Sequence, residues 1–244
     1  AAEETEPSTT ESEPPTETET ESETGTETEE PTEEETEGPG DPVDREKIET
    51  HLIIASDTHY MSPSLTDYGV AFDQLVNSND GKVIRYQPQL WQAFKSEVLA
   101  ANPDALILSG DLSLNGEKAN HLEFSEKLRE IEEAGVPVYV IPGNHDINKP
   151  DAGEYFGDQR TDVESVTSEE FREIYADFGY NEAKSGAPDS LSYLVELNDT
   201  TWLMMLDTTV CEPENEVYGE IKEGTLEWME ECLKEAYAEG ITVI

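Results

Sequence analysis

LIIASDTH, residues 52–59, is the first of three apolar runs that each end in a polar motif; the others are ALILSGD, residues 105–111, and VYVIPGNHD, residues 138–146. The apolar part of each run is short, rich in branched side chains and bounded by turn-forming residues, which is typical of buried strands. In open α/β sheets, ligands bind beyond the carboxyl ends of the strands, where all three motifs would lie. The sequence therefore predicts one binding site at which the three motifs meet.

In each of the two segments between these runs, apolar residues recur at helical spacing, which predicts a helix. The first predicted helix spans about 88–101, and the second spans about 117–134, where Gly135 closes it. Their apolar stripes are Leu90, Trp91, Phe94 and Val98 in the first helix, and Leu122, Leu128 and Ile131 in the second. Two such crossovers imply neighbouring parallel strands that are joined in the right-handed sense.

The second half of the sequence predicts further α and β elements after an irregular stretch beyond Pro150. These elements are a helix over 168–178 capped by Ser168, a hairpin of 192–197 and 201–206, a helix over about 225–238 with a stripe of Leu226, Met229, Leu233 and Tyr237, and a strand that starts at Ile241. No internal repeat is visible. The pattern as a whole indicates an α/β fold.

The three motifs contain the side chains of a metal site. Asp57 and His59 are two apart at a strand end, so they project to the same side and can hold one metal ion through an oxygen and a nitrogen. The carboxylate of Asp111 has two oxygens and can bridge two cations. In the GNHD motif, Asn144 offers an amide oxygen, and the imidazole of His145 is suited to proton transfer near neutrality. This tetrad arises by chance on the order of once in a thousand chains of this length, so it is the most specific of the three motifs.

In their order and strand context, these motifs resemble those of the calcineurin-like metallophosphoesterases, which carry DxH, GD, GNHD or GNHE, and later histidines. The resemblance runs from about residue 51 to residue 244. It implies an αββα sandwich, in which two mixed sheets are flanked by helices and a dinuclear metal site lies at the strand ends.

The resemblance also implies a role for each motif residue. Asp57 and His59 would bind the first metal ion, Asp111 would bridge both ions, and Asn144 would bind the second. His145 would lie beside the leaving group as general acid or charge stabiliser. Two such cations hold the phosphate oxygens and lower the pKa of a bound water that attacks phosphorus. Mixed nitrogen and oxygen ligands favour manganese, iron or zinc over magnesium or calcium.

Two features of the sequence bear on the substrate. Protein phosphatases of this family carry GDxxDRG, whereas Leu114 and Asn115 stand here at the positions of the aspartate and the phosphate-binding arginine, which disfavours a phosphoprotein phosphatase. The chain looks closer to the bacterial branch with cyclic-nucleotide phosphodiesterases and other small phosphodiesterases and phosphomonoesterases. Residues 60–87 are an insertion that either caps the site and selects the substrate or packs its own aromatic side chains. Its aromatic residues are Tyr60, Tyr68, Phe72 and Tyr86.

The remaining histidines do not complete the expected ligand set. The family supplies further metal-binding histidines after a later strand, and this sequence ends inside that strand, so we expect a domain that lacks its last strands and binds metal weakly. His51 lies at the wrong end of its strand, and His121 is expected to be solvated or packed in its helix. Asp146 either orients His145 or caps a turn, and the turn is favoured. Asp207 is expected to be a turn residue at a strand end.

Composition divides the chain into an acidic segment, residues 1–42, and a globular domain, residues 43–244. The first segment contains 17 acidic residues, no basic residue and almost no apolar residue, so we expect a disordered Glu/Thr/Pro-rich stalk or an inert tail. Subtracting its 17 acids from the 58 in the chain leaves 41 acids against 14 bases, a net charge of −27 for the domain. Nucleic acid and membrane surfaces are therefore not expected as partners of the folded domain.

Together these features predict a metal-dependent phosphoesterase that hydrolyses small phosphomonoesters or phosphodiesters with two divalent metal ions. An extracellular or cell-surface location is expected, with a signal or anchor already removed and the stalk as a possible tether. Cys211 and Cys232 are expected to be two thiols rather than a disulfide. The alternative is a noncatalytic surface-binding module built on a truncated or degenerate core. A third hypothesis, an acidic cation-binding protein, predicts that removal of residues 1–40 abolishes binding.

Overall fold

The computed structural model describes residues 43–78, 82–212 and 214–244. The predicted stalk, residues 1–42, lies outside these ranges. Within them, no helix combines the length and the apolarity that a membrane crossing requires. Cys211 and Cys232 are both free thiols, as predicted.

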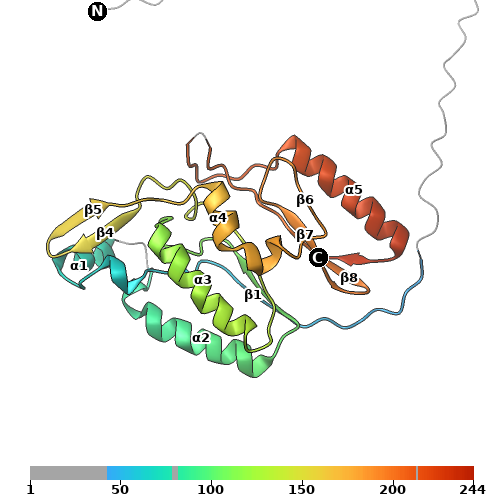
Figure 1. The fold of residues 1–244 in the computed structure, drawn as a ribbon, viewed down its shortest axis with the longest axis horizontal. Coiled ribbons are helices and arrows are strands. Elements are labelled where there is room, and N and C mark those ends of the chain that lie inside the picture. Colours follow the sequence, from blue (N-terminus) through green and yellow to red (C-terminus); the bar gives the residue numbers. More distant parts are fainter. Residues whose placement is uncertain (1–42, 79–81, 213) are drawn as a thin grey trace, which may run out of the picture. The chain divides into compact units, whose positions relative to one another are not determined.

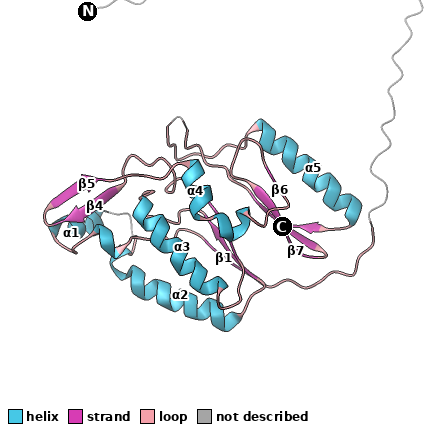
Figure 2. Cartoon of the chain, in the orientation of Figure 1, coloured by secondary structure: helices cyan, strands magenta, loops and turns pink. Residues whose placement is uncertain are grey.

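The three apolar runs form one parallel sheet with the strand order β1–β2–β3. Figures 1 and 2 label β1 of this sheet. Its elements are β1 (Leu52–Ala55), β2 (Ala105–Ser109), β3 (Val138–Ile141) and the two connecting helices α2 (Gln87–Ala101) and α3 (Lys118–Glu132). These strands and helices are the predicted ones, with bounds that differ by one or two residues. Because all three strands run in the same direction, their carboxyl ends lie at one edge of the sheet.

A second sheet contains the predicted hairpin and has the order β6–β7–β8–β9, in which β8 and β9 are parallel and the other pairs antiparallel. Its elements are β6 (Ser185–Gly186), β7 (Tyr193–Asn198), β8 (Thr201–Met205), helix α5 (Glu223–Glu239) and β9 (Thr242–Val243). The last predicted helix and strand are thus present.

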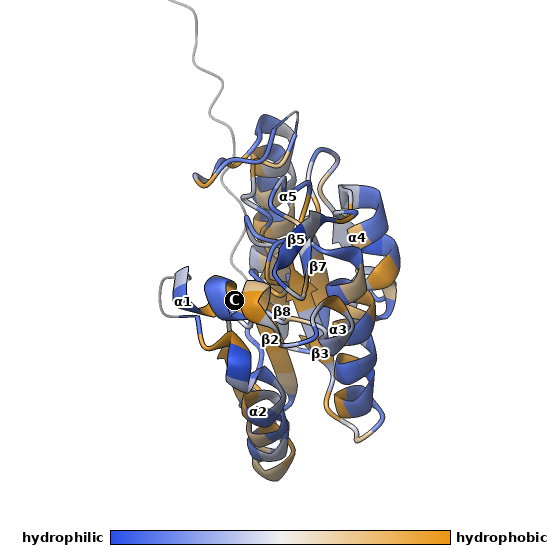
Figure 3. Ribbon diagram, turned by 90° about the vertical axis from the view of Figure 1, so that its left-hand side faces the viewer, coloured by the Kyte–Doolittle hydropathy of each residue, from blue (hydrophilic) through white to orange (hydrophobic). Residues whose placement is uncertain are grey.

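The main hydrophobic core joins side chains of both sheets with those of α2 and α3. The hydroxyl of Tyr193 on β7 donates a hydrogen bond of 2.8 Å to the carbonyl of Val140 on β3, so the two sheets are also linked by a polar contact. Helices α2 and α3 lie on the outer side of the first sheet and α5 on the outer side of the second (Figure 1). Hydrophobic residues accordingly concentrate along the central strands (Figure 3). This is the predicted α/β sandwich of two sheets flanked by helices. The prediction of two mixed sheets is wrong for the first, whose described strands are all parallel because a helix crosses over between each pair, and correct for the second.

Four of the described α-helices and strands were not predicted, namely β6 of the second sheet and three elements that lie together. Helix α1 (Val70–Ser78) lies in the insertion 60–87, and the hairpin of β4 (Gly153–Phe156) and β5 (Gln159–Asp162) lies in the stretch that was expected to be irregular. The helix and the hairpin pack together over a small separate core, which contains Leu65, Phe72, Ile84, Leu114 and Tyr155. The aromatic residues of the insertion divide between burial, at Tyr60 and Phe72, and exposure, at Tyr68 and Tyr86. The insertion therefore packs part of its own aromatic set.

The structure corrects three predicted helix faces. On α2, Leu90 is half exposed, whereas Trp91 and Val98 are buried as predicted. On α3, Leu122 is half exposed, whereas Leu128 and Ile131 are buried as predicted. On α5, three residues of the predicted stripe are exposed, namely Leu226, Leu233 and Tyr237, and the buried face contains Thr225, Trp228, Cys232 and Ala236 instead. The reason is that Trp228 fills the space beside Trp202 of β8, which rotates the more apolar row away from the sheet.

Helix α4 (Ser168–Ile174) starts and ends differently from its prediction. Its N-cap is Thr167, not Ser168, because the Thr167 side chain accepts from the backbone N–H of Glu170 while the Glu170 side chain bonds back to Thr167. This reciprocal pair is a capping box. The helix ends before residue 178 because the segment Ala176–Tyr180 is kinked, with a φ angle of 111° at Gly179.

Candidate functional site

The carboxyl ends of the three parallel strands bring the three motifs together. The backbone N–H of Asp57 donates to the carbonyl of Gly110 at 3.1 Å, and that of His59 donates to the carbonyl of Asp111 at 2.9 Å. The first two loops are thus hydrogen-bonded to each other directly beyond the strands. The GNHD loop joins them through the backbone N–H of His145, which donates to Oδ1 of Asp111 at 3.0 Å.

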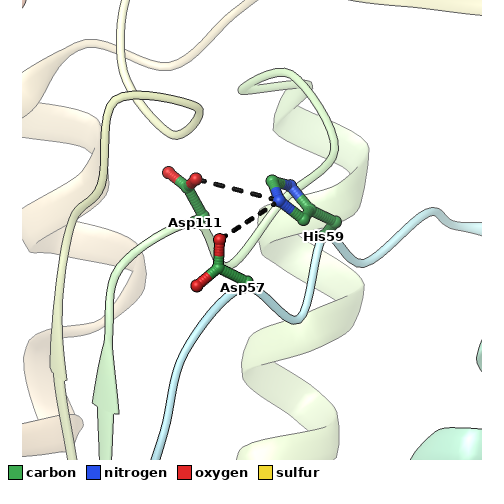
Figure 4. A group of neighbouring side chains, drawn as sticks. All are labelled: Asp57, His59 and Asp111. Carbon is green, nitrogen blue, oxygen red and sulfur yellow. Dashed lines mark ion pairs between the residues drawn. The ribbon is translucent and has the colours of Figure 1, made fainter. Parts of the chain in front are cut away.

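Asp57, His59 and Asp111 form a cluster of possible metal ligands in which one atom from each residue lies within 4.8 Å of the other two (Figure 4). Nε2 of His59 is 3.6 Å from Oδ1 of Asp57 and 3.8 Å from Oδ2 of Asp111. The Asp57 side chain is mostly exposed, that of Asp111 is mostly covered and the imidazole is buried. One face of the cluster is therefore open to solvent.

These distances fit a metal ion. Zinc and similar ions bind imidazole nitrogen and carboxylate oxygen at about 2.1 Å, so two ligands of one ion lie at most about 4.2 Å apart. Both distances from the His59 nitrogen fall below that value. The buried Nδ1 of His59 meets no well-formed hydrogen-bond partner among the described residues.

The backbone at all three residues is in the left-handed region, with φ angles of 57° at Asp57, 41° at His59 and 51° at Asp111. Residues other than glycine rarely adopt this conformation, and it concentrates at functional sites. Close contact between Gly110 and Gly143 accompanies it, because a Cβ on Gly110 would lie 2.9 Å from the Cα of Gly143. The two glycines thus allow the second and third loops to touch.

Asn144 lines a cavity of about 300 Å³ together with both carboxylates of the cluster, Asp57 and Asp111. The predicted second metal ligand and the predicted bridging ligand therefore face the same space. The carbonyl of Asn144 accepts from the amide of Asn215, which fixes this part of the GNHD loop. The segment of residues 214–219 that follows β8 supplies the opposite wall, with Val217, Tyr218 and Gly219.

His145 lies against the cluster, and its ring is perpendicular to that of His59 with 4.9 Å between the ring centroids. Its Nδ1 is 2.8 Å from the carbonyl of Leu114 and 3.0 Å from Oδ1 of Asn115. A carbonyl oxygen can only accept, so Nδ1 carries the proton and donates. Leu114 and Asn115, which stand where a protein phosphatase of this family has its aspartate and arginine, thus orient the His145 imidazole.

The electrostatic surroundings favour neutral imidazoles. Burial lowers the pKa of both His59 and His145, the positive charge of Lys82 lowers each pKa further, and the Asp111 carboxylate opposes the shift. A neutral imidazole keeps a lone pair on one nitrogen, which is the form that binds metal ions.

Asp146 is a residue of the site whose role the sequence analysis missed. It is fully buried, and its carboxylate accepts from the backbone N–H groups of Leu112, Ser113 and Gly143 and from the Ser113 hydroxyl. Burial raises the pKa of Asp146 to about 7, against these four donors. Both predicted roles for Asp146, a turn cap and a direct bond to the His145 ring, are therefore wrong. Its carboxylate instead connects the GD loop to the GNHD loop by hydrogen bonds. No sequence signal distinguishes such a contact from a turn.

The other histidines lie outside the cluster. His51 is exposed at the opening end of β1, and His121 is fully buried, with Nδ1 2.9 Å from the Tyr175 hydroxyl and Nε2 2.9 Å from the Asp146 carbonyl. The packed alternative for His121 is thus correct, and burial lowers its pKa to about 4. Asp207 accepts from the backbone of Thr209 and forms the predicted turn at the end of β8.

Comparison with known proteins agrees with this geometry. Residues 50–243 match the sequence model of the calcineurin-like phosphoesterases. A comparison with curated proteins found no match to the chain. The matched range contains all three motifs and both sheets and covers most of the chain. On this match, the chain belongs to the calcineurin-like phosphoesterase family.

Proposed function

We propose that this chain hydrolyses phosphomonoesters or phosphodiesters of small molecules and that it uses two divalent metal ions. Membership of the family implies a metal-dependent phosphoesterase in general terms. The observation that carries the proposal further is the convergence of Asp57, His59 and Asp111 within 4.8 Å at the end of the parallel sheet, with His145 in ring contact.

Four side chains would hold the ions. Asp57 and His59 would bind the first, Asp111 both, and Asn144 the second, because Asn144 shares its cavity with the two carboxylates. When bound, such ions neutralise phosphate oxygens and activate a water molecule. The mixed nitrogen and oxygen donors favour manganese, iron or zinc.

His145 would act on the leaving group. Its Nδ1 is held by the carbonyl of Leu114, so Nε2 is the ring atom that can exchange a proton or a hydrogen bond with substrate. The Asp111 carboxylate holds the backbone of the same residue at 3.0 Å. One side chain would therefore position both the metal ions and the histidine.

A small phosphate ester is the substrate class that this surface favours. The net charge of −44 repels nucleic acid. Leu114 is buried and Asn115 contacts His145, so the arginine by which protein phosphatases of this family bind phosphate has no counterpart at that position.

The test is the number of manganese or zinc ions that bind the full chain at excess metal, measured by titration. We expect two ions for the wild type, loss of both for Asp111→Ala, and no change for Asp199→Ala, which removes an exposed carboxylate in the β7–β8 turn. Loaded wild type should also hydrolyse p-nitrophenyl phosphate or its bis-ester.

Two results would contradict the proposal. Retention of two tightly bound ions by Asp111→Ala would exclude the bridging role. A wild-type chain that holds no ion and hydrolyses neither ester would exclude a dinuclear hydrolase and favour a noncatalytic binding module.

A further inference from the structure

A second cavity, of about 410 Å³, opens beside His145 on the side of the insertion. Its lining includes Lys82, Asn115, Asp151, Tyr155 and Arg160 together with residues of α1. The cavity described above is lined by Asn144, the preceding residue of the same loop. The GNHD loop thus borders both cavities, one with the metal-ligand cluster and one with two basic side chains.

Lys82 contacts the imidazole at the border of this cavity. Its Nζ lies 3.4 Å from Nε2 of His145. Because Nδ1 of that ring donates to the Leu114 carbonyl, the neutral ring has its lone pair on Nε2, and the ammonium group of Lys82 donates to it. A positive charge therefore lies beside the ring atom that the proposed function assigns to the leaving group.

The residues that follow Lys82 in the sequence fix its position. Ile84, two residues later, is buried in the core between α1 and the β4–β5 hairpin, and Arg85 pairs with Asp73 of α1. Gln87 then donates through its side-chain amide to the carbonyls of Thr58 and His59. The segment that carries Lys82 is thus attached directly to the loop of the first predicted metal ligands.

The second basic side chain of the cavity, Arg160, belongs to the β4–β5 hairpin. Arg160 pairs with Asp162 and donates to the carbonyls of Asp151 and Ala152. Its charge and donors serve the β4–β5 hairpin. Lys82 contacts the imidazole of His145 itself, so Lys82 is the candidate for a cation that meets an anion beside that ring.

A positive side chain at this place favours the binding of an anionic substrate. The domain from residue 43 onward has a net charge of −27, and Asp57 and Asp111 add negative charge at the point where a phosphate would bind. We propose that Lys82 is a substrate-binding residue, whose ammonium group holds an oxygen of the substrate phosphate beside His145. This inference rests on the proposed function and adds to it a phosphate-binding residue contributed by the insertion.

The experiment measures the binding of inorganic phosphate and of orthovanadate to the full chain by calorimetry, after manganese loading and metal analysis. We expect Lys82→Ala to keep the wild-type metal content and to bind both anions at least about tenfold more weakly, since a hydrogen bond between charged groups is lost. Lys82→Arg should recover most of the affinity. Lys234→Ala removes an equal charge from the exposed side of α5 and should bind as wild type does.

Anion affinity that is equal in wild type and Lys82→Ala, at equal metal content, would overturn the role of Lys82. An affinity that falls equally in Lys234→Ala would also overturn it, because net charge would then be the cause. Failure of the proposed function is visible separately, as a wild type without bound metal. In that case, phosphate and orthovanadate are titrated into the metal-free wild type and Lys82→Ala. An equal anion affinity of the two proteins would again contradict the role of Lys82.

Discussion

At the scale of single residues, the site combines a strained backbone with contacts that tolerate no added atom. Asp57, His59 and Asp111 have positive φ angles, which cost on the order of 1 kcal/mol each for residues other than glycine. Hydrogen bonds between the loops hold this conformation, and Gly143 lies against the backbone and side chain of Asp111. The position of the Asp111 carboxylate therefore depends on the absence of a side chain at Gly143.

Gly143→Ala should disrupt the site more than the fold. A Cβ at this position would lie 2.2 Å from Oδ1 of Asp111 and 2.3 Å from its backbone nitrogen, so Asp111 must move. We expect a stability loss of about 1–3 kcal/mol and at least about tenfold weaker metal binding, measured by denaturant unfolding and metal titration. Gly186→Ala is the control, because its Cβ would meet only the Ser192 carbonyl at 3.3 Å. Wild-type metal affinity in Gly143→Ala would contradict the described contact.

Glu132, at the end of α3, should make stability depend on pH. Burial raises the pKa of this carboxyl to about 7 in the folded chain, against about 4.5 for the ordinary side chain. Between these values the unfolded chain loses its proton while the folded chain keeps it, so this residue's contribution to the free energy of unfolding falls as pH rises from about 4.5 to 7. Below 4.5 it is fully present, and above 7 it is lost.

Glu132→Gln should remove this dependence while Gln keeps the oxygen that accepts from the backbone of Val138. The free energy of unfolding of the variant, relative to wild type, should rise between pH 5 and pH 8. Because the side chain is partly exposed, the rise should be on the order of 1 kcal/mol. Urea unfolding at four pH values measures it, with Glu133→Gln as the exposed neighbouring control. A pH-independent difference would show that Glu132 titrates as an ordinary side chain.

Part of the site was predictable because its side chains follow strands that the apolar pattern identifies. Asp57, His59 and Asp111 come together since parallel neighbouring strands end at one edge. The role of Asp146 and the presence of Lys82 at the site were not predicted, because Leu112 and Ser113, which donate to Asp146, and His145, which Lys82 contacts, lie more than thirty residues from them in the chain. The metal roles of Asp57, His59, Asp111 and Asn144, and the catalytic role of His145, stay predictions.

At the scale of elements, the N-cap of α4 is Thr167, one residue before the cap that the sequence predicts. Ser168 and Thr167 are both good N-cap residues, but only the Thr167 side chain accepts from the N–H of Glu170. Thr167→Ala should therefore destabilise the chain by about 1 kcal/mol, whereas Ser168→Ala should cost clearly less. Thermal and denaturant unfolding of the two variants provide the comparison. Equal losses would mean that the capping box contributes nothing specific.

A helix or strand was predictable when its residues show a clear apolar pattern. The strands β2 and β3 consist almost entirely of buried apolar residues, which a sequence shows directly. Strand β5 is exposed along its whole length and reads QRTD, so nothing in its sequence distinguishes it from a loop. Helix α1 packs against both strands of this hairpin, and that contact lies between segments about 80 residues apart, so no local pattern encodes it.

At the scale of the whole molecule, the two sheets share one core, but the charge opposes compactness. The domain has a net charge of −27, and most of its ion pairs lie on exposed side chains, where each contributes little. Repulsion among the surplus carboxylates therefore lowers the stability of the folded state. The hydrophobic contacts between the sheets and their helices must exceed this repulsion.

Monovalent salt should consequently stabilise the chain. Raising NaCl from 10 to 200 mM shortens the Debye length from about 30 Å to below 10 Å and screens this repulsion. We expect Tm to rise by about 2–5 °C at pH 8 in the presence of EDTA, which removes any metal contribution. The rise should be smaller at pH 5, where some carboxylates are protonated and fewer charges repel. A Tm that is constant or falls with salt at pH 8 would mean that the exposed ion pairs outweigh the surplus negative charge.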